Sequence, residues 1–228
     1  MTEENHIPKR ANFFEKQYSK IADVITPFLI SYSANQITIV SGICGVVGSL
    51  LLISSSYLAL FLSAIFIQLF SVLDLVDGNI ARIKKIESKF GHWLDIFFDK
   101  FVDFIIILTS SLGIYINNDN SNILICGMLL MGSVFFSQLI MLMNSSEKYF
   151  STSRTKFTSY LNNQNKISYI FKIIYFYRQH LSYQHNTFLF LISFFAIIDQ
   201  IEFGIYFLTI HTFISLFLSI IINFLRIK

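Results

Sequence analysis

The sequence predicts an all-α membrane protein that crosses the bilayer several times. Of its 228 residues, 54% are hydrophobic and only 14% are charged, a balance too apolar for a soluble domain of this length. The apolar residues gather in blocks close to the roughly 20 residues that a helix needs to cross the hydrocarbon. Only two prolines and nine glycines interrupt the chain, which favours helical structure throughout.

Six segments have the hydropathy of a membrane span, and the fifth of them is short. They are 37–53, 57–78, 91–116, 123–143, 186–199 and 203–225. The first two are separated by three serines, which predicts a very tight turn. We therefore expect a polar N-terminal segment, 1–36, followed by a polytopic domain of six transmembrane helices, 37–228.

Residues 9–33 form a different kind of segment. Their apolar residues recur at spacings of three and four, at Phe14, Tyr18, Ile21, Ile25 and Phe28. This periodicity predicts an N-terminal amphipathic helix that lies in the membrane interface rather than crossing it. The alternative is a soluble helix packed on the cytoplasmic loops. No early apolar core with a cleavage site precedes the segment, so we expect no removable signal peptide.

The basic residues fall on one side of the predicted spans. With the N-terminus in the cytoplasm, no Lys or Arg falls in an outer loop; the loop 117–122 has Asp119 as its only charge. The positive-inside rule then predicts an integral protein of the plasma (inner) membrane with both termini in the cytoplasm. The net charge is only +3, and we expect the lipid bilayer, but no nucleic acid, as a partner.

The most specific signal is a run with fixed spacing, D-x2-D-G-x2-A-R-x8-G-x3-D-x3-D. It comprises Asp74, Asp77, Gly78, Ala81, Arg82, Gly91, Asp95 and Asp99. The first four lie at i, i+3, i+4 and i+7, so they share one helix face, and the last three share a face of the next helix. A turn between the two helices would bring both aspartate pairs to one depth at the cytoplasmic face.

Four carboxylates beside a membrane span need compensating positive charge. A divalent cation with oxygen ligands meets that need, and we expect Mg2+ or Mn2+, as two ions, where substrate phosphates share the coordination. Gly78 and Ala81 leave the helix backbone bare for a diphosphate, and Arg82 can bind phosphate with two hydrogen bonds. The alternative, salt bridges to nearby Arg82, Lys84, Lys85 or Lys100, explains neither Gly78 nor Gly91.

The run resembles the signature of the CDP-alcohol phosphotransferase family of membrane enzymes, and every fixed position of that signature is met. Members displace CMP from a CDP-linked alcohol by attack of a second alcohol's hydroxyl, using a divalent metal. The resemblance implies that Asp74, Asp77 and Asp95 ligate metal. It also implies that Asp99 helps to bind metal and takes the proton from the attacking hydroxyl. Family members tend to be homodimers.

A weaker resemblance lies at the entry to the first span, where Asn35, Thr38 and Gly42 match the family and Ala34 replaces its usual proline. It implies that Asn35 and Thr38 contact the nucleotide, although an N-cap role is equally compatible with Asn35. We expect Gly91 to contribute to the same binding site for the nucleotide and its diphosphate.

Two further residues, Asp103 and His92, lie in the motif region. Asp103 continues the aspartate face, either as support for the site or as a partner of Lys100, whereas His92 is expected to point off that face.

The resemblance, with the motif at the cytoplasmic face, implies transfer of the phosphatidyl group of CDP-diacylglycerol to a small alcohol, in phospholipid biosynthesis. An alternative keeps the chemistry but takes a water-soluble CDP-alcohol as donor and a lipid or polyol phosphate as acceptor. A distant alternative is a transporter, which the lack of a matching acidic cluster in 123–228 disfavours. Serine, glycerol phosphate, inositol phosphate and other polyols remain open as acceptors. Basic residues of one cytoplasmic segment either bind an acceptor's phosphate or only follow the positive-inside rule: Arg154, Lys156, Lys166, Lys172 and Arg178.

Overall fold

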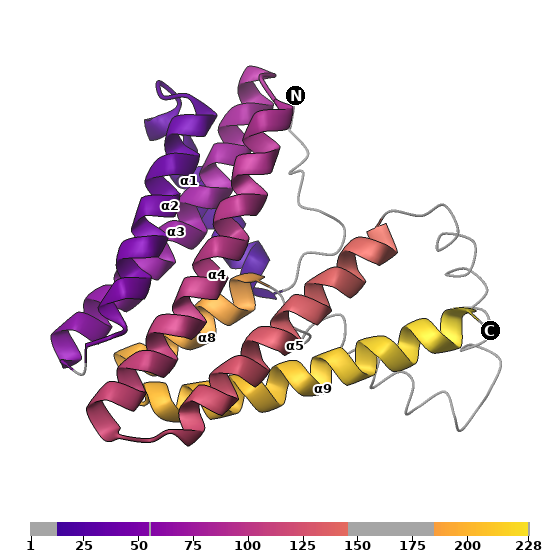
Figure 1. The fold of residues 1–228 in the computed structure, drawn as a ribbon. Helices are drawn as coiled ribbons and strands as arrows, with labels where there is room; N and C mark the ends of the chain where they lie inside the picture. The colour runs from indigo at the N-terminus through magenta and orange to yellow at the C-terminus, as the bar shows by residue number, and fades with distance from the viewer. Residues whose placement is uncertain (1–12, 55, 146–184, 228) are drawn as a thin grey trace. The chain divides into compact units, whose positions relative to one another are not determined.

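The computed structural model describes residues 13–54, 56–145 and 185–227, and every regular element in that part of the chain is an α-helix. The helices are α1 (Phe13–Leu29), α2 (Ala34–Leu51), α3 (Tyr57–Lys84), α4 (Lys89–Asn118), α5 (Asn122–Ser145), α8 (His185–Ile197) and α9 (Ile201–Ile227) (Figure 1). The all-α class is confirmed, and each of the six predicted spans corresponds to one helix from α2 onward.

Four of these helices are long and apolar enough to cross a membrane. They are α2, α3, residues 122–140 of α5 and residues 201–221 of α9. The chain is therefore an integral membrane protein. The described part of α8 has 13 residues, about 20 Å at 1.5 Å per residue, against roughly 30 Å of hydrocarbon. The first half of α4 carries charged side chains. The count of six spans accordingly stays a prediction.

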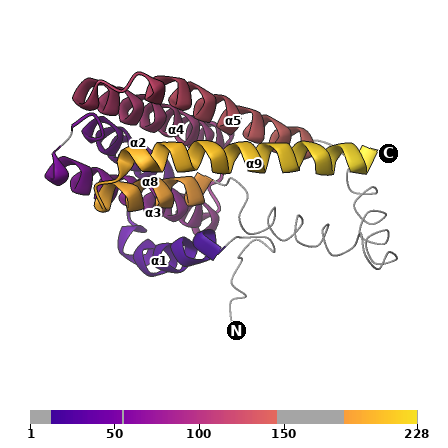
Figure 2. The same cartoon turned by 90° about the horizontal axis from the view of Figure 1, so that it is seen from below.

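The described helices fall into two compact units. The first contains α1 to α4, α5 as far as Gly127, α8, and α9 as far as Phe207. The second contains the remainder of α5 and α9, which lie side by side (Figure 2), with the Ser133 and Thr212 hydroxyls 2.6 Å apart. Every described residue of the candidate site lies in the first unit.

Close packing of α2 against α3 and α4 depends on small residues. The buried face of α2 includes Ser41, Gly42, Gly45, Gly48 and Ser49. A Cβ atom at Gly45 would lie 2.6 Å from Val102 Cγ2 of α4, and one at Gly48 would lie 3.0 Å from the Ile67 nitrogen of α3. The Ser63 hydroxyl donates to the Gly48 carbonyl over 2.6 Å. Small residues let membrane helices approach closely, and here they fix α3 and α4 on α2.

A four-residue turn, 85–88, reverses the chain between α3 and α4. Lys85 ends α3 in the left-handed conformation, with φ 56°, and the Ile86 amide donates to the Ala81 carbonyl over 3.0 Å. Ser88 caps α4, because its hydroxyl accepts from the Gly91 amide over 2.9 Å. As a result, the two halves of the aspartate motif face each other from antiparallel helices.

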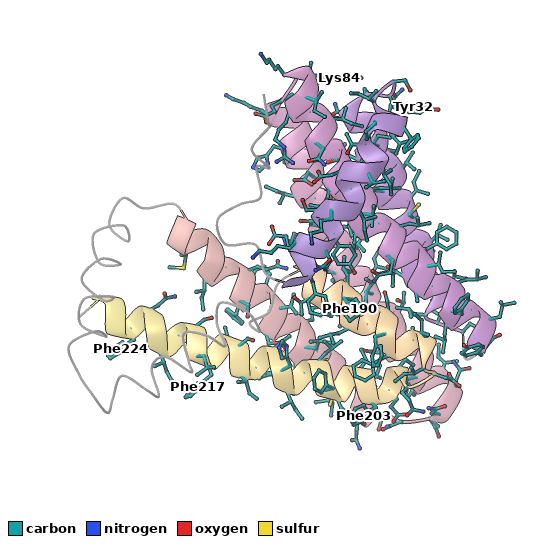
Figure 3. The ribbon with its side chains drawn as sticks, turned by 180° about the vertical axis from the view of Figure 1, so that it is seen from behind. Tyr32, Lys84, Phe190, Phe203, Phe217 and Phe224 are labelled. Atoms are coloured by element: carbon teal, nitrogen blue, oxygen red, sulfur yellow. The ribbon has the colours of Figure 1, made fainter. Side chains whose placement is uncertain are left out.

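One face of α1 packs on α3 and α8. Tyr18 is buried, and its hydroxyl donates to Gln68 of α3, whose amide donates to Ser193 of α8 over 2.9 Å. Burial raises the pKa of Tyr18 to about 12, so the hydroxyl keeps its proton and remains a donor. At the start of α1, the ring of Phe14 packs on that of Phe190 of α8 (Figure 3), with the ring centroids 4.5 Å apart. These contacts attach α1 to the helices of the first unit.

Several large apolar residues of α1 are exposed, among them Ile21, Val24 and Phe28. The amphipathic helix expected in 9–33 thus has a protein-facing side and an exposed apolar side. Its placement in the membrane interface stays a prediction, and residues 9–12 of the expected helix lie outside the described part. At the far end of α1 the chain turns into α2, where the Lys84 ammonium donates to the Tyr32 carbonyl over 2.8 Å (Figure 3).

Candidate active site

Three carboxylates of the motif converge in the first unit. Asp74 of α3 and Asp95 and Asp99 of α4 each offer one oxygen within 4.8 Å of the other two. Asp74 Oδ1 is buried and has no hydrogen-bond partner among the described residues. An unsatisfied buried oxygen beside two further carboxylates is unfavourable without a cation. The donor set, all oxygen and all anionic, fits a divalent ion such as Mg2+ or Mn2+.

Asp77 is placed differently from the other three aspartates. It is 5% exposed, and its Oδ2 accepts a 2.5 Å hydrogen bond from the Thr38 hydroxyl of α2. It is not a member of the three-carboxylate group, although Asp77 and Asp95 line the same cavity. Its role as a metal ligand therefore stays a prediction, with one of its oxygens engaged by Thr38.

A cavity of about 330 Å³ opens beside this cluster, between α2, α3 and the start of α4. Its volume is in the range of small-molecule pockets. All the residues predicted for the nucleotide and diphosphate line it: Asn35, Thr38, Gly78, Ala81, Arg82 and Gly91. The lining also contains residues that the sequence analysis missed or misplaced: Ile86, Glu87, Ser88 and His92. The expectation that His92 points away from the site is wrong.

The two motif glycines are needed for different reasons. A Cβ atom at Gly78 would find its nearest neighbour in Arg82 Nη2, at 3.6 Å, so protein packing does not require glycine there. The space over Gly78 belongs to the cavity. At Gly91, by contrast, a Cβ atom would lie 2.9 Å from Asn35 Oδ1 and 3.1 Å from Ser88 Oγ. Gly91 therefore lets the Asn35 side chain approach α4.

The start of α2 excludes the alternative role considered for Asn35. Ser33 is the N-cap, since its hydroxyl accepts from the Gln36 amide over 3.3 Å and Gln36 Oε1 accepts from the Ser33 amide over 2.9 Å. The N-cap reading of Asn35 is wrong, which leaves its side chain available to the cavity.

Two basic residues at the end of α3, Arg82 and Lys84, bind uncharged groups. Arg82 Nη2 donates to Asn79 Oδ1 over 2.7 Å, and Lys84 Nζ donates to the Tyr32 carbonyl. Neither side chain therefore neutralises the aspartates through these hydrogen bonds. The basic residues proposed for an acceptor phosphate, Arg154 to Arg178, lie outside the described residues.

His185, at the start of α8, is a site residue that the sequence did not reveal. Its Nε2 lies 3.2 Å from Asp99 Oδ1, and its Nδ1 lies 3.0 Å from Asp103 Oδ1. Asp103 is 2% exposed, so this contact is made in the protein interior. The contact supports the reading in which Asp103 backs the site. No spacing in the sequence links His185 to residues so far away, and a lone histidine carries no metal-site pattern.

The chain is similar to known proteins in sequence and in fold. A family model for CDP-alcohol phosphatidyltransferases matches residues 31–221. The fold is similar to that of Mycobacterium tuberculosis phosphatidylinositol phosphate synthase (PgsA1) in complex with manganese and citrate, with a TM-score of 0.57, 16% identity, and 87% and 85% of the two chains covered. For the structure of the same synthase with CDP-DAG bound, the TM-score is 0.52 at 16% identity, and the match covers 88% of this chain and 90% of that chain.

Two curated relatives match a shorter stretch. The bifunctional IPC transferase and DIPP synthase of Aquifex aeolicus is 35% identical over 86 residues, which is 37% of this chain and 19% of the relative. The protein of the same name from Thermococcus kodakarensis is 36% identical over 69 residues, 30% of this chain and 15% of the relative. The chain thus matches only a small part of these relatives. The family model, however, covers most of the chain and all of the aspartate motif, and the chain belongs to the CDP-alcohol phosphatidyltransferase family.

Proposed function

We propose that the protein is a membrane transferase of phospholipid biosynthesis that displaces CMP from CDP-diacylglycerol with the hydroxyl of a small alcohol. One observation carries the proposal: Asp74, Asp95 and Asp99 meet within 4.8 Å beside a cavity that Asp95 also lines. The similar fold of a synthase crystallised with manganese and with CDP-DAG supports a divalent metal and a lipid-linked donor.

The donor's nucleotide and diphosphate would occupy the cavity. Gly78 and Ala81 present a bare stretch of α3, and the Arg82 guanidinium lies next to it, ready to donate to phosphate oxygens. Asn35 and Thr38 approach from α2 and Gly91 from α4. With three helices contributing, the site is built on rigid elements, as positioning of a reacting phosphate requires.

The four aspartates of the motif would hold Mg2+ or Mn2+, as two ions in keeping with the number of carboxylates. The metal, when bound, stabilises charge on the diphosphate and on the departing CMP. Asp99 takes the proton from the acceptor's hydroxyl, and His185 holds the Oδ1 side of that carboxylate. The hydroxyl oxygen bonds to the phosphorus that carries diacylglycerol. The bond from this phosphorus to the oxygen between the two phosphates breaks, and its electron pair leaves with CMP.

The charge distribution supports an active site at the cytoplasmic face of the plasma (inner) membrane, with both termini on that side. In this orientation the acyl chains of the donor stay in the bilayer while the cytidine and the acceptor alcohol come from water. We also propose a homodimer, following the tendency of the family.

The test is a screen of CMP release by the full-length protein in lipid nanodiscs with Mg2+. Radiolabelled CDP-diacylglycerol is the donor, and serine, glycerol phosphate and inositol phosphate are added one at a time. Asp99→Asn is compared with Asp119→Asn, the same change at the C-cap of α4, where the left-handed backbone at φ 52° suits asparagine. Acceptor-dependent release that Asp99→Asn abolishes and Asp119→Asn retains is the expected result.

A second candidate keeps the chemistry and changes the donor to a water-soluble CDP-alcohol, with a lipid or polyol phosphate as acceptor. The screen therefore includes a water-soluble CDP-alcohol with a lipid or polyol-phosphate acceptor. Activity only with the soluble donor would replace CDP-diacylglycerol and keep the chemistry. Silence with both donor classes and all acceptors would contradict the proposed function.

A further inference from the structure

We infer that Asn79 is a positioning residue for Arg82, and that α1, through Asp23 and Thr26, is a working part of the donor site. Asn79 occupies a variable place in the motif, directly after Gly78, so its identity is not part of the signature. The inference rests on the proposed function, because it takes Arg82 to bind the donor's diphosphate.

Three hydrogen bonds connect α1 to Arg82 through one amide. Asn79 Oδ1 accepts from Arg82 Nη2 over 2.7 Å. Asn79 Nδ2 donates to Asp23 Oδ1 over 3.0 Å and to Thr26 Oγ1 over 3.3 Å. The amide thus joins the end of α3 to a helix more than 50 residues earlier in the chain.

The orientation of this amide is fixed by chemistry. Asp23 can only accept and the guanidinium of Arg82 can only donate, so the amide nitrogen must face α1 and the amide oxygen must face Arg82. Thr26 is 2% exposed and its hydroxyl proton goes to the Ala22 carbonyl over 2.7 Å, which leaves its oxygen to accept from Asn79. The opposite amide orientation would place like groups against each other on both sides.

The position in which Arg82 is held is the one that a diphosphate would need. Arg82 Nη2 lies 3.6 Å from the place of a Cβ atom on Gly78, and both residues line the cavity. Arg82 itself is exposed at the last turn of α3, where a long side chain would otherwise sample many rotamers. Holding the guanidinium in place before the donor arrives lowers the ordering cost of binding.

The helix that anchors Asn79 is itself well fixed. Its Tyr18 hydroxyl bonds Gln68 of α3, and Phe14 packs on Phe190 of α8. Asp23 and Thr26 are therefore presented to α3 by a helix attached at several points, and Asn79 has a rigid support.

The experiment measures donor affinity and turnover with the full-length protein in nanodiscs. The dissociation constant of CDP-diacylglycerol is determined with Mn2+, and the donor KM, acceptor KM and kcat are determined from CMP release. The variants are Asn79→Ala, the double change Asp23→Ala/Thr26→Val on α1, and all three changes combined. Gln17→Ala, at another exposed position on α1, is the matched control.

Asn79→Ala should raise the donor Kd and KM about tenfold and leave kcat and the acceptor KM within about twofold. The α1 double variant should raise the donor Kd about threefold and add nothing to Asn79→Ala, because both act through the same contact. Gln17→Ala should match the wild type. A merely structural role would instead reduce the amount of active protein, which changes apparent kcat and not KM.

An unchanged donor Kd in Asn79→Ala, or a loss confined to kcat, would overturn the inference. The proposed function would still stand if the wild type releases CMP in the same assay. An effect of Asn79→Ala without any effect of the α1 double variant would overturn the part assigned to α1. A wild type that neither binds CDP-diacylglycerol nor releases CMP would overturn both the proposed function and this inference.

Discussion

The Thr38 hydroxyl of α2 donates a 2.5 Å hydrogen bond to Asp77 Oδ2 of α3, across 39 residues of sequence. Both groups are buried, with Thr38 3% and Asp77 5% exposed. The bond fixes the orientation of the Asp77 carboxylate and connects the entry of the first span to the aspartate motif. A carboxylate that binds metal is commonly oriented in this way by a neighbouring donor.

Thr38→Val is expected to weaken metal activation, because it removes this donor and keeps the shape of the side chain. The concentration of Mn2+ that gives half-maximal CMP release should rise about tenfold, the low end of the effect of such supporting contacts. Thr38→Ser retains the hydroxyl and should stay close to the wild type. An identical Mn2+ dependence in Thr38→Val would show that Thr38 does not support a metal ligand.

His185→Ala is expected to lower both stability and activity, since it removes the contacts to Asp99 and Asp103 at 3.2 Å and 3.0 Å. Removing one member of a buried charged pair costs on the order of 3 kcal/mol. The double variant His185→Ala/Asp103→Asn should regain part of the thermal stability, because the buried charge is removed as well. Its CMP release should stay low, because Asp99 still lacks His185.

Thermal unfolding in detergent, followed alongside CMP release, separates the two effects. If the double variant is no more stable than His185→Ala, the contact with Asp103 is not the source of the loss. If His185→Ala keeps wild-type turnover, the placement of Asp99 does not depend on α8.

Gly78→Ala should leave folding intact and impair donor binding. The added Cβ would lie 3.6 Å from Arg82 Nη2, an ordinary contact, but it would enter the cavity in which the diphosphate is proposed to bind. We expect the donor KM to rise at least about tenfold with an unchanged melting temperature. Gly113→Ala is the contrasting variant, because its Cβ would lie 2.6 Å from the Leu52 carbonyl oxygen.

Gly113→Ala should therefore lower the melting temperature and leave the donor KM of the folded fraction unchanged. A wild-type donor KM in Gly78→Ala would mean that the donor does not approach this part of α3. A lowered melting temperature in Gly78→Ala would mean that the glycine serves packing after all.

Much of the fold was predictable because apolar blocks of membrane length leave little choice of structure. The expected second span, 57–78, corresponds to α3, which continues to Lys84. The helix ends there because Lys85 adopts the left-handed conformation. Hydropathy marks where a segment leaves the hydrocarbon, and the backbone is free to remain helical beyond that point.

The face that α1 buries was harder to predict. The apolar positions 14, 18, 21, 25 and 28 indicated one stripe, yet Ile21 is 47% and Phe28 80% exposed while Ala22 and Thr26 are buried. The buried side is rotated toward small residues, because these allow α1 to lie close to α3. A protein with a lipid environment can leave large apolar side chains on the outside, so hydrophobicity alone does not identify the packed face.

Within the site, the helical spacing predicted that both aspartate pairs would converge. The structure brings Asp74, Asp95 and Asp99 together, whereas Asp77 lies outside this group. His185 could not be predicted, since its nearest site partners lie in another helix and no periodicity connects them. Residue spacing likewise did not predict the contact between Thr38 and Asp77. Contacts between helices depend on packing angles that the sequence pattern does not specify.

In the proposed function, the carboxylate cluster holds the metal on which CMP release depends. The most direct measurement is acceptor-dependent CMP release after chelation and during re-addition of Mn2+, for the wild type, Asp95→Asn and Asp119→Asn. We expect no release after chelation, full recovery in the wild type and Asp119→Asn, and a requirement for at least about tenfold more Mn2+ in Asp95→Asn. Release that persists after chelation, or an Asp95→Asn variant with the wild-type Mn2+ dependence, would contradict that proposal.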